Sequence, residues 1–423
     1  MRTSLVSMLS VVTLATLAVA GCAPSDEDSA DQIKVWSHAG GSTEEIAVVQ
    51  GIVDDYNASQ AEVTVVLESF PQSSYNDAVV AAAASGDLPC VVDMDGPIVP
   101  NWAWADYIQP LDLPTDLTDS LLPSTVGRYQ DEIYAVGAFD AALTINARRS
   151  ALVDNGIRIP TLDEPWTLEE FDAALVTLSA DERFEYPIDL GVWDANEWWS
   201  YAYSPMLQSF GGDLVDRETY LSADGVLNGP EGLAFAEWFQ SVFERGLASR
   251  TPTADGQDFP QGNVAMVYGG SWKALDSAET FGDDAIILPV PDFGEGPVIG
   301  GGSWQLGVSS TCANPEAAND YLEFSLQDKY IVEFSDAVGV IPATDTAAQQ
   351  AEYFKEGGLL AELPEISRQL ARVRPETPGY AVISTSFGKA MQDLVAGADP
   401  QATLDQAVKD IDANIKSNDG YGF

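Results

Sequence analysis

The feature that most constrains how this 423-residue chain can fold is a repeated switch between strand-like and helix-like hydrophobic spacing, which begins near residue 32. Apolar segments predict strands at residues 33–36, 63–67 and 90–93. Between them, Ser42 and Glu45 have the spacing of a helix capping box, and an alanine-rich helical segment ends at Gly86. Such strand–helix alternation is typical of an α/β fold with a largely parallel sheet.

A second unit of the same kind is predicted beyond residues 135–145, an apolar run that reads as a strand. Thr167 and Glu170 repeat the capping box, and Pro230 begins a helix with an aromatic face. A pair of helices is expected from about Tyr380 onward. With 46% hydrophobic residues, a chain of this length can bury about two or three domain-sized cores.

The charge of the chain limits its partners. The sequence has 66 Asp and Glu against 19 Lys and Arg, a formal net charge of −47. A chain this acidic repels phosphate backbones and anionic lipid head groups, so we expect no nucleic-acid partner and no membrane attachment through a basic patch. The acidity predicts a solvated surface, with an acidic face for one cationic partner as the alternative.

The N-terminus resembles an export signal. Arg2 precedes a largely apolar run, and residues 19–22 (Val-Ala-Gly-Cys) resemble a bacterial lipobox, in which the cysteine becomes acylated. We predict a signal peptide at residues 1–21, a lipid anchor such as palmitate on Cys22, and a polar tether at residues 22–31. Acyl chains would then hold the protein on the extracellular face of a bacterial cell membrane.

The remaining cysteines, Cys90 and Cys312, are an even pair. In an exported protein such a pair is compatible with a disulfide, and two buried free thiols are the alternative.

The sequence offers little for catalysis. Its one histidine, His38, rules out a metal site with two histidine ligands, and a structural zinc site is not expected. The motifs of α/β-hydrolases, phosphate loops and dinucleotide-binding folds are absent. We therefore expect no cofactor, no metal and no enzymatic activity. A glycoside hydrolase with an Asp/Glu pair stays open as the alternative, because 66 acidic residues make some close pair inevitable.

Aromatic residues next to glycines are more informative. Trp272 lies in residues 268–273 (Tyr-Gly-Gly-Ser-Trp-Lys), and Trp304 ends residues 300–304 (Gly-Gly-Gly-Ser-Trp). Glycines beside an indole leave room for a ligand against the ring, and a sugar needs such faces together with a few carboxylates. We favour ligand contact for these two residues, against core packing as the alternative.

Two polar residues follow predicted strands. His38 comes after the first strand and Asp95 after the third, and open α/β sheets bind their ligands at the carboxyl ends of strands. The alternatives are a histidine bonded within its turn and an aspartate that caps a helix or stabilises a turn.

Motifs along the chain resemble the carbohydrate-binding branch of the extracellular solute-binding proteins, with maltose-binding protein as a distant relative. They are residues 33–36 (Ile-Lys-Val-Trp), 55–57 (Asp-Tyr-Asn), 84–89 (Ala-Ser-Gly-Asp-Leu-Pro), 137–140 (Gly-Ala-Phe-Asp), 210–213 (Phe-Gly-Gly-Asp), 264–266 (Val-Ala-Met), 300–303 (Gly-Gly-Gly-Ser), 339–342 (Gly-Val-Ile-Pro) and 374–378 (Arg-Pro-Glu-Thr-Pro). The resemblance departs at Cys90, where such proteins often carry Asp.

The resemblance implies a two-lobed α/β fold of the type II periplasmic-binding-protein class. Its N-terminal lobe would comprise residues 32–139 and 304–341, and its C-terminal lobe residues 140–303 and 342–423. Three hinge crossings would lie near residues 139–140, 302–303 and 341–342. Family topology also places the strand after Cys90 beside the strand before Cys312 and antiparallel to it, so the two cysteines could meet.

The resemblance further implies a monomeric binding component of an ABC importer. It would capture a neutral carbohydrate, an oligosaccharide by its many aromatic faces, and deliver it to the transmembrane subunits of a permease. The residues that it implies for the cleft are His38 and Asp95 from the first lobe, Asp140 from the hinge, Trp199, Tyr201, Trp272 and Arg374 from the second lobe, and Trp304 at a crossing.

Overall fold

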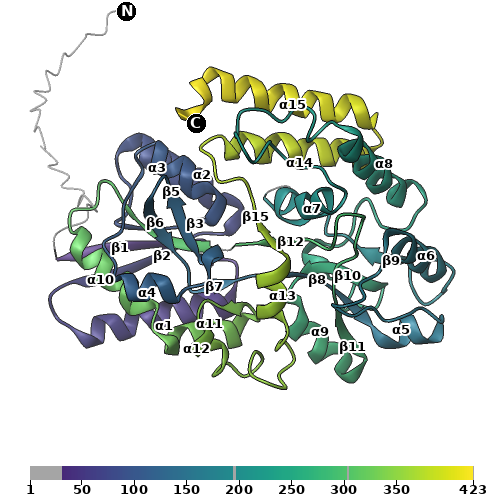
Figure 1. The fold of residues 1–423 in the computed structure, drawn as a ribbon. Coiled ribbons are helices and arrows are strands. Elements are labelled where there is room, and N and C mark those ends of the chain that lie inside the picture. The colour runs from purple at the N-terminus through teal and green to yellow at the C-terminus, as the bar shows by residue number, and fades with distance from the viewer. Residues whose placement is uncertain (1–30, 194–196, 303, 423) are drawn as a thin grey trace, which may run out of the picture.

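The computed structural model describes residues 31–193, 197–302 and 304–422. The predicted signal peptide, the anchor residue Cys22, nearly all of the tether and the crossing residue Ser303 lie outside the described residues. Two main sheets lie side by side, each covered by helices, with shorter strands between them (Figure 1). Within the described residues, no helix is both long enough and apolar enough to cross a membrane.

The first sheet has the order β2-β1-β3-β13-β6-β5, and β4 pairs with β13. Its strands are β1 (Gln32–Ser37), β2 (Thr64–Ser69), β3 (Val91–Asp95), β4 (Ile108–Gln109), β5 (Val126–Tyr129), β6 (Glu132–Val136) and β13 (Trp304–Ser309). Strands β2 and β3 run parallel to β1, whereas β13 runs antiparallel to both β3 and β6.

Helices cover both faces of the first sheet. One core joins β1–β3 to α1 (Thr43–Ser59), α10 (Pro315–Ser325) and α11 (Asp328–Val338), and a second joins the other face of β3 to α2 (Gln72–Ser85) and α3 (Val99–Trp104). Two further short helices are α4 (Thr115–Ser120) and α12 (Asp345–Ala348).

The second sheet has the order β11-β8-β10-β9. Its strands are β8 (Leu143–Arg148), β9 (Tyr186–Asp189), β10 (Val264–Gly270) and β11 (Ala285–Leu288). Its helices are α5 (Arg149–Asp154), α6 (Leu168–Leu178), α7 (Trp198–Ser209), α8 (Pro230–Glu244), α9 (Lys273–Phe281), α13 (Leu363–Leu370), α14 (Tyr380–Ala396) and α15 (Pro400–Ser417).

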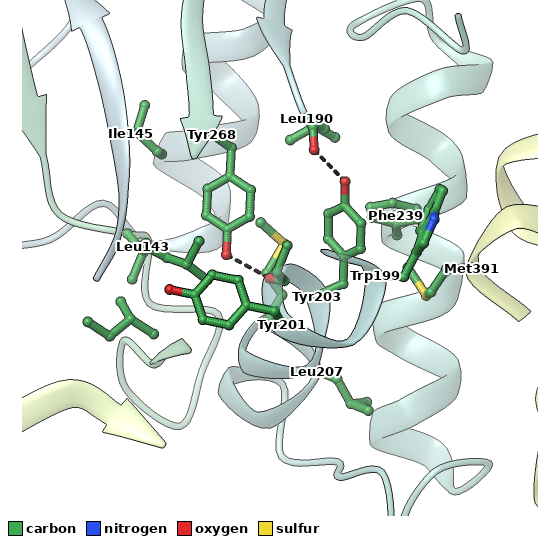
Figure 2. Close-up of a cluster of buried hydrophobic side chains, with 14 of the residues drawn as sticks. Leu143, Ile145, Leu190, Trp199, Tyr201, Tyr203, Leu207, Phe239, Tyr268 and Met391 are labelled. Atoms are coloured by element: carbon green, nitrogen blue, oxygen red, sulfur yellow. Dashed lines mark hydrogen bonds between the residues drawn. The ribbon is translucent and has the colours of Figure 1, made fainter. Parts of the chain in front are cut away.

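Helix α7 is the centre of the second core. Nearly all its residues are buried, because it lies between β8 and β10 on one side and helices α8 and α14 on the other (Figure 2). Its buried backbone accepts a hydrogen bond from the hydroxyl of Tyr268 on β10, 2.7 Å from the carbonyl oxygen of Ala202. The tyrosine therefore satisfies its own polar group while filling an apolar core.

Two short pairs of strands lie between the main sheets (Figure 1). Strand β7 (Phe139–Asp140) pairs antiparallel with β14 (Ile341–Pro342), and β12 (Ile299–Gly301) pairs parallel with β15 (Ala371–Val373). Each pair joins segments that are distant in the sequence.

Local sequence signals are confirmed where they concern helix ends. Ser42 accepts a hydrogen bond from the backbone of Glu45 at the start of α1, and a complete capping box opens α6. Helix α2 ends at Gly86, whose φ of 78° is a left-handed conformation that suits glycine. Helices α8 and α14 begin at the residues that the sequence predicts, Pro230 and Tyr380.

Two expectations about the strands are wrong. The apolar run 135–145 is not one strand: it contributes the end of β6, then β7, then the start of β8, as the chain passes from the first sheet to the second. The sheets are also mixed rather than largely parallel, because β13 enters the first sheet after the chain has formed the second, in the opposite direction to β3.

Cys90 and Cys312 are joined by a disulfide, with a distance of 4.4 Å between their Cα atoms. Cys90 immediately precedes β3 and Cys312 follows β13, and these strands pair antiparallel with Val91 opposite Val308. The pairing brings together cysteines that are 222 residues apart in the chain.

Candidate ligand-binding cavity

A cavity of about 490 Å³ lies between the two main sheets. Its walls include His38, just after β1, and Asp95 at the end of β3, together with Tyr268 and Gly269 near the end of β10. The carboxyl ends of strands from both sheets therefore face the same space, as is common for ligand sites in α/β proteins.

On the side of the first sheet, His38 is held at both ring nitrogens. Its Nδ1 lies 2.5 Å from Oδ2 of Asp93, and its Nε2 lies 3.2 Å from Oε1 of Glu45. Burial lowers the pKa of His38, but the two carboxylates outweigh it and raise the pKa to about 10. The imidazole is therefore a cation at neutral pH, and it stacks on Trp304 with ring centres 3.6 Å apart and planes within 8°.

A buried arginine joins the two sides of the cavity. Nη1 and Nη2 of Arg374 donate to the two carboxylate oxygens of Asp95 at 2.6 and 2.8 Å, and Nη1 also donates to Glu197 at 2.6 Å. Its guanidinium lies 5.0 Å from the ring centre of Tyr201. Because Asp95 ends β3 and Glu197 immediately precedes α7, this triad connects the first sheet to the second half of the molecule.

Glu197 has further partners on α14. The Tyr380 hydroxyl donates to one carboxylate oxygen, and Ser384 Oγ donates to the other at 2.6 Å. Burial raises the pKa of Glu197, and the charge of Asp95 adds to the rise, whereas Arg374 and the two hydroxyl groups oppose it. The carboxylate is thus the junction of a polar network in an otherwise aromatic wall.

The aromatic residues of that wall include Trp198, Tyr201 and Trp272. The rings of Tyr201 and Trp272 stack with centres 6.3 Å apart, and Trp198 meets Trp272 edge to face at 6.4 Å. The glycine before the turn makes room for the indole itself: a Cβ on Gly270 would lie 1.9 Å from Cζ3 of Trp272. The space that we expect the glycines to leave for a ligand is therefore, at Gly270, occupied by the indole of Trp272 itself.

Ionisable groups on the cavity wall balance one another. Three acidic residues, Glu45, Asp95 and Glu197, face three basic residues, and these are His38, Lys273 and Arg374. In a chain with a formal net charge of −47, this space is formally neutral among the described residues once His38 is protonated.

Six of the predicted site residues line the cavity: His38, Asp95, Tyr201, Trp272, Trp304 and Arg374. Trp199 does not, because neighbouring residues of a helix point in different directions. Trp198 and Tyr201 line the cavity. Trp199 is 2% exposed and packs in the core beside Tyr203 (Figure 2). Its predicted ligand contact is replaced by core packing.

Asp140 also lies away from the cavity lining. It is fully buried on β7 and accepts hydrogen bonds from Ser124 Oγ at 2.8 Å, Ser367 Oγ at 2.7 Å and the backbone N–H of Gly302 at 2.8 Å. Burial raises its pKa, and these hydrogen bonds oppose the rise. The carboxylate thus fastens together segments that run between the sheets, instead of contacting a ligand.

Sequence reasoning did not assign several charged or aromatic residues of the wall to the cleft, among them Glu45, Glu197 and Trp198. The signal for Trp198 is its place beside Trp199, because neighbouring residues of a helix point in different directions. Glu197 had no signal that separates it from the other acidic residues, because its role depends on Arg374, which is distant in the sequence.

Two mixed sheets that face a balanced, aromatic cavity define an α/β protein with a periplasmic-binding-protein-like fold. Residues 51–361 match the protein family described as bacterial extracellular solute-binding protein. The chain belongs to this family, whose members bind a solute without changing it, so the protein is a binding protein and not an enzyme. The glycoside hydrolase alternative is therefore wrong.

Named relatives agree with this assignment. The chain is 26% identical over 255 residues to the maltodextrin-binding protein MdxE of Bacillus subtilis, a match that covers 57% of this chain and 60% of that relative. Among solved structures it is similar to the cyclic alpha-maltosyl-1,6-maltose binding protein of Arthrobacter globiformis, with 23% identity, 91% and 99% coverage of this chain and that one, and a TM-score of 0.72. It is also similar to the maltose/maltodextrin-binding domain MalE of Bdellovibrio bacteriovorus bound to maltotriose, with 17% identity, 91% and 100% coverage, and a TM-score of 0.76.

Proposed function

We propose that this protein is the substrate-binding component of an ABC importer and captures a neutral carbohydrate, an oligosaccharide, in the cavity between its two sheets. The observation that carries the proposal is a charge-balanced cavity with aromatic rings on both sides. Sugar rings stack their C–H faces on aromatic side chains while their hydroxyl groups bond to polar residues. The names of its relatives, which refer to maltose and maltodextrin, support the same ligand class.

The charge distribution favours a neutral sugar over a sugar phosphate. Both His38 and Arg374 are already bonded to two carboxylates each. A phosphate would need basic groups that are not already neutralised in this way. An uncharged ligand can enter the cavity without breaking these ion pairs.

Two buried donors support hydrogen bonding to hydroxyl groups. Among the described residues, Trp198 Nε1 and Arg374 Nε have no hydrogen-bond partner, and both side chains line the cavity. A buried donor without a partner costs about 1–3 kcal/mol, so a sugar hydroxyl that accepts from it regains that energy. Both nitrogens lie beneath the cavity surface, so we expect donation to the bound carbohydrate to require a shift of these side chains.

The cavity suits a ligand longer than one sugar ring. Its volume of about 490 Å³ lies within the usual range of ligand sites. Trp304 offers one aromatic surface on the side of the first sheet, and the pair of Tyr201 and Trp272 offers another on the opposite side. Separate surfaces of this kind favour an oligosaccharide.

We further propose that the two sheets belong to two lobes that close on the ligand. The lobes would comprise residues 32–139 with 304–341, and 140–303 with 342–423, and the short pairs β7–β14 and β12–β15 support crossings near residues 139–140, 302–303 and 341–342. A ligand that contacts both walls favours the closed arrangement, because only then does it gain all its contacts.

Delivery requires the protein to stay near the permease. We propose that acylation of Cys22 anchors the mature protein, as a monomer, to the extracellular face of the cell membrane, where it passes the sugar to the transmembrane subunits. The anchor is tested by expressing the wild type and the Cys22→Ala variant and by measuring how much of each protein is in the membrane fraction of the cells. A Cys22→Ala variant that remains in the membrane fraction would exclude it.

The binding function itself is tested with purified protein that lacks residues 1–30. We expect maltose, maltotriose and longer malto-oligosaccharides to raise its melting temperature, and the sugars to be recovered unaltered. A panel of neutral disaccharides of other linkages shows whether the preference is for this class. If neither neutral mono- nor oligosaccharides raise the melting temperature, the proposed ligand class is wrong.

A further inference from the structure

The only histidine of the chain, His38, is fixed in place by residues of several elements. Asp93 of β3 contacts Nδ1 at 2.5 Å, and Glu45 of α1 contacts Nε2 at 3.2 Å. The side chains of all three residues are largely buried. Because both nitrogens are bonded to carboxylates, His38 can donate to a ligand only by giving up one of these partners.

The ring face of His38 is used as well. It stacks on the indole of Trp304, with centres 3.6 Å apart and planes 8° from parallel. Tyr75 of α2 packs against both rings: its ring meets Trp304 edge to face at 5.7 Å and His38 edge to face at 6.5 Å. Trp304 is only partly buried and lines the cavity, so this packing fixes an indole whose remaining surface faces the ligand space.

We propose that His38 is a positioning residue, which acts on the carbohydrate through Trp304: the two carboxylates hold the imidazole, and the imidazole holds the indole at the angle that the sugar ring requires. The inference rests on the proposed function for its ligand. It differs from the sequence-based expectation that His38 itself binds the ligand.

The charge of His38 strengthens the stack. A cation over an indole face is attracted by the electrons of the ring, and tryptophan is the best partner for such an interaction. The groups that face His38 are Asp93 of β3, Glu45 of α1, Tyr75 of α2 and Trp304 of β13, and the two carboxylates keep its pKa at about 10 despite burial. His38 therefore stays protonated near neutral pH, and its stacking on Trp304 does not depend on pH in that range.

A double-mutant cycle for binding of maltotriose, or of the best neutral sugar in the panel, tests whether His38 acts through Trp304. We expect His38→Gln and Trp304→Ala each to weaken binding about tenfold. We expect the double variant to be no weaker than Trp304→Ala alone, because the histidine has nothing left to position. Independent, multiplying losses would mean that His38 contacts the sugar directly and would overturn the proposal.

Two matched variants on α1 distinguish a loss of the contact that holds His38 from a general loss of stability. Glu45→Gln removes one carboxylate from His38, whereas Glu44→Gln changes an exposed neighbour that does not contact the ring. We expect only Glu45→Gln to lower affinity and to lower the pKa of His38, which NMR reads from the single histidine signal of an untagged protein. Equal behaviour of the two variants in both measurements would contradict the proposal.

The position of Trp304 can also be read without any sugar. In protein labelled with 5-fluorotryptophan, the Trp304→Phe variant identifies the Trp304 signal in the ¹⁹F spectrum. We expect His38→Gln to shift or broaden that signal, while an unchanged signal would refute the positioning role. Failure of the wild-type protein to bind any carbohydrate would instead refute the proposed function, and this spectrum would still decide whether His38 positions the indole.

Discussion

Gly270→Ala is the sharpest test of how the aromatic wall is built. The substitution adds one methyl group at the end of β10, where it would lie 1.9, 2.1 and 2.2 Å from three ring atoms of Trp272. No real side chain tolerates such distances, so the indole must move. The strand itself is not strained, because Gly270 does not have a positive φ.

The expected cost divides unequally between folding and binding. Overpacking of a core costs about 1–3 kcal/mol, but Trp272 borders a cavity and can swing into it, so we expect a loss of stability near the low end, about 1 kcal/mol. The displaced indole would then occupy ligand space and lose its stack with Tyr201, 6.3 Å away. Losing one aromatic face of about 1.4 kcal/mol weakens binding about tenfold.

A glycine outside the cavity lining provides the control. A Cβ on Gly51, within α1, would meet no atom within 4 Å. We therefore expect Gly51→Ala to bind sugar as the wild type does. Calorimetric titration gives the affinities, and urea unfolding gives the stabilities. Equal affinities for the two variants would show that the close approach of Gly270 and Trp272 does not set the shape of the site.

Three further perturbations test other parts of the structure. Replacing both Cys90 and Cys312 by Ser should lower the free energy of unfolding in urea by up to about 5 kcal/mol, because the long chain segment between them is no longer closed into a loop. Equal urea midpoints for the wild type and the double variant would argue against the disulfide. Glu197→Gln should lower the free energy of unfolding by about 1–3 kcal/mol, because it weakens a buried ion pair. The control Glu237→Gln, on the exposed side of α8, should change it by less than about 0.5 kcal/mol, and similar losses for the two variants would contradict this reasoning. The pKa of His38 is raised from 6.5 to about 10, so the stabilisation from its charge is complete below pH 6.5 and is lost as the pH rises through about 10. The difference in unfolding free energy between the wild type and His38→Gln should therefore narrow over that pH range. A constant difference would show that the histidine is not charged in the folded protein.

Sequence reasoning succeeded where the cause of a structure is local. A capping box lies within four residues, so Ser42 with Glu45 and Thr167 with Glu170 predict the starts of α1 and α6. The carboxyl ends of β1 and β3 likewise follow from the strand pattern, and His38, which follows β1, lines the cavity. Resemblance to a family supplied the pairing of distant strands, which no local pattern contains.

It failed where a residue's role depends on a partner far away in the chain. Trp198 and Trp199 are chemically the same, and only the rotation of α7 between the sheet and α14 decides which of them faces the cavity. Asp140 looked like a ligand residue because of its position at a crossing, yet partners from residues 124, 302 and 367 surround it. Glu197 acquires its role from distant partners, among them Arg374, which lies 177 residues later.

The pairing of β3 with β13 has a consequence for the geometry of the cavity. Trp304, at the start of β13, lies directly opposite Asp95, at the end of β3, and the disulfide joins the other end of the same two strands. A slip of one residue between them would turn every side chain to the opposite face of the sheet, moving the indole away from His38 and the carboxylate away from Arg374. The covalent bond at the far end opposes that slip, so two cysteines outside the cavity help to keep Trp304 and Asp95 in register on the first-sheet side of the cavity.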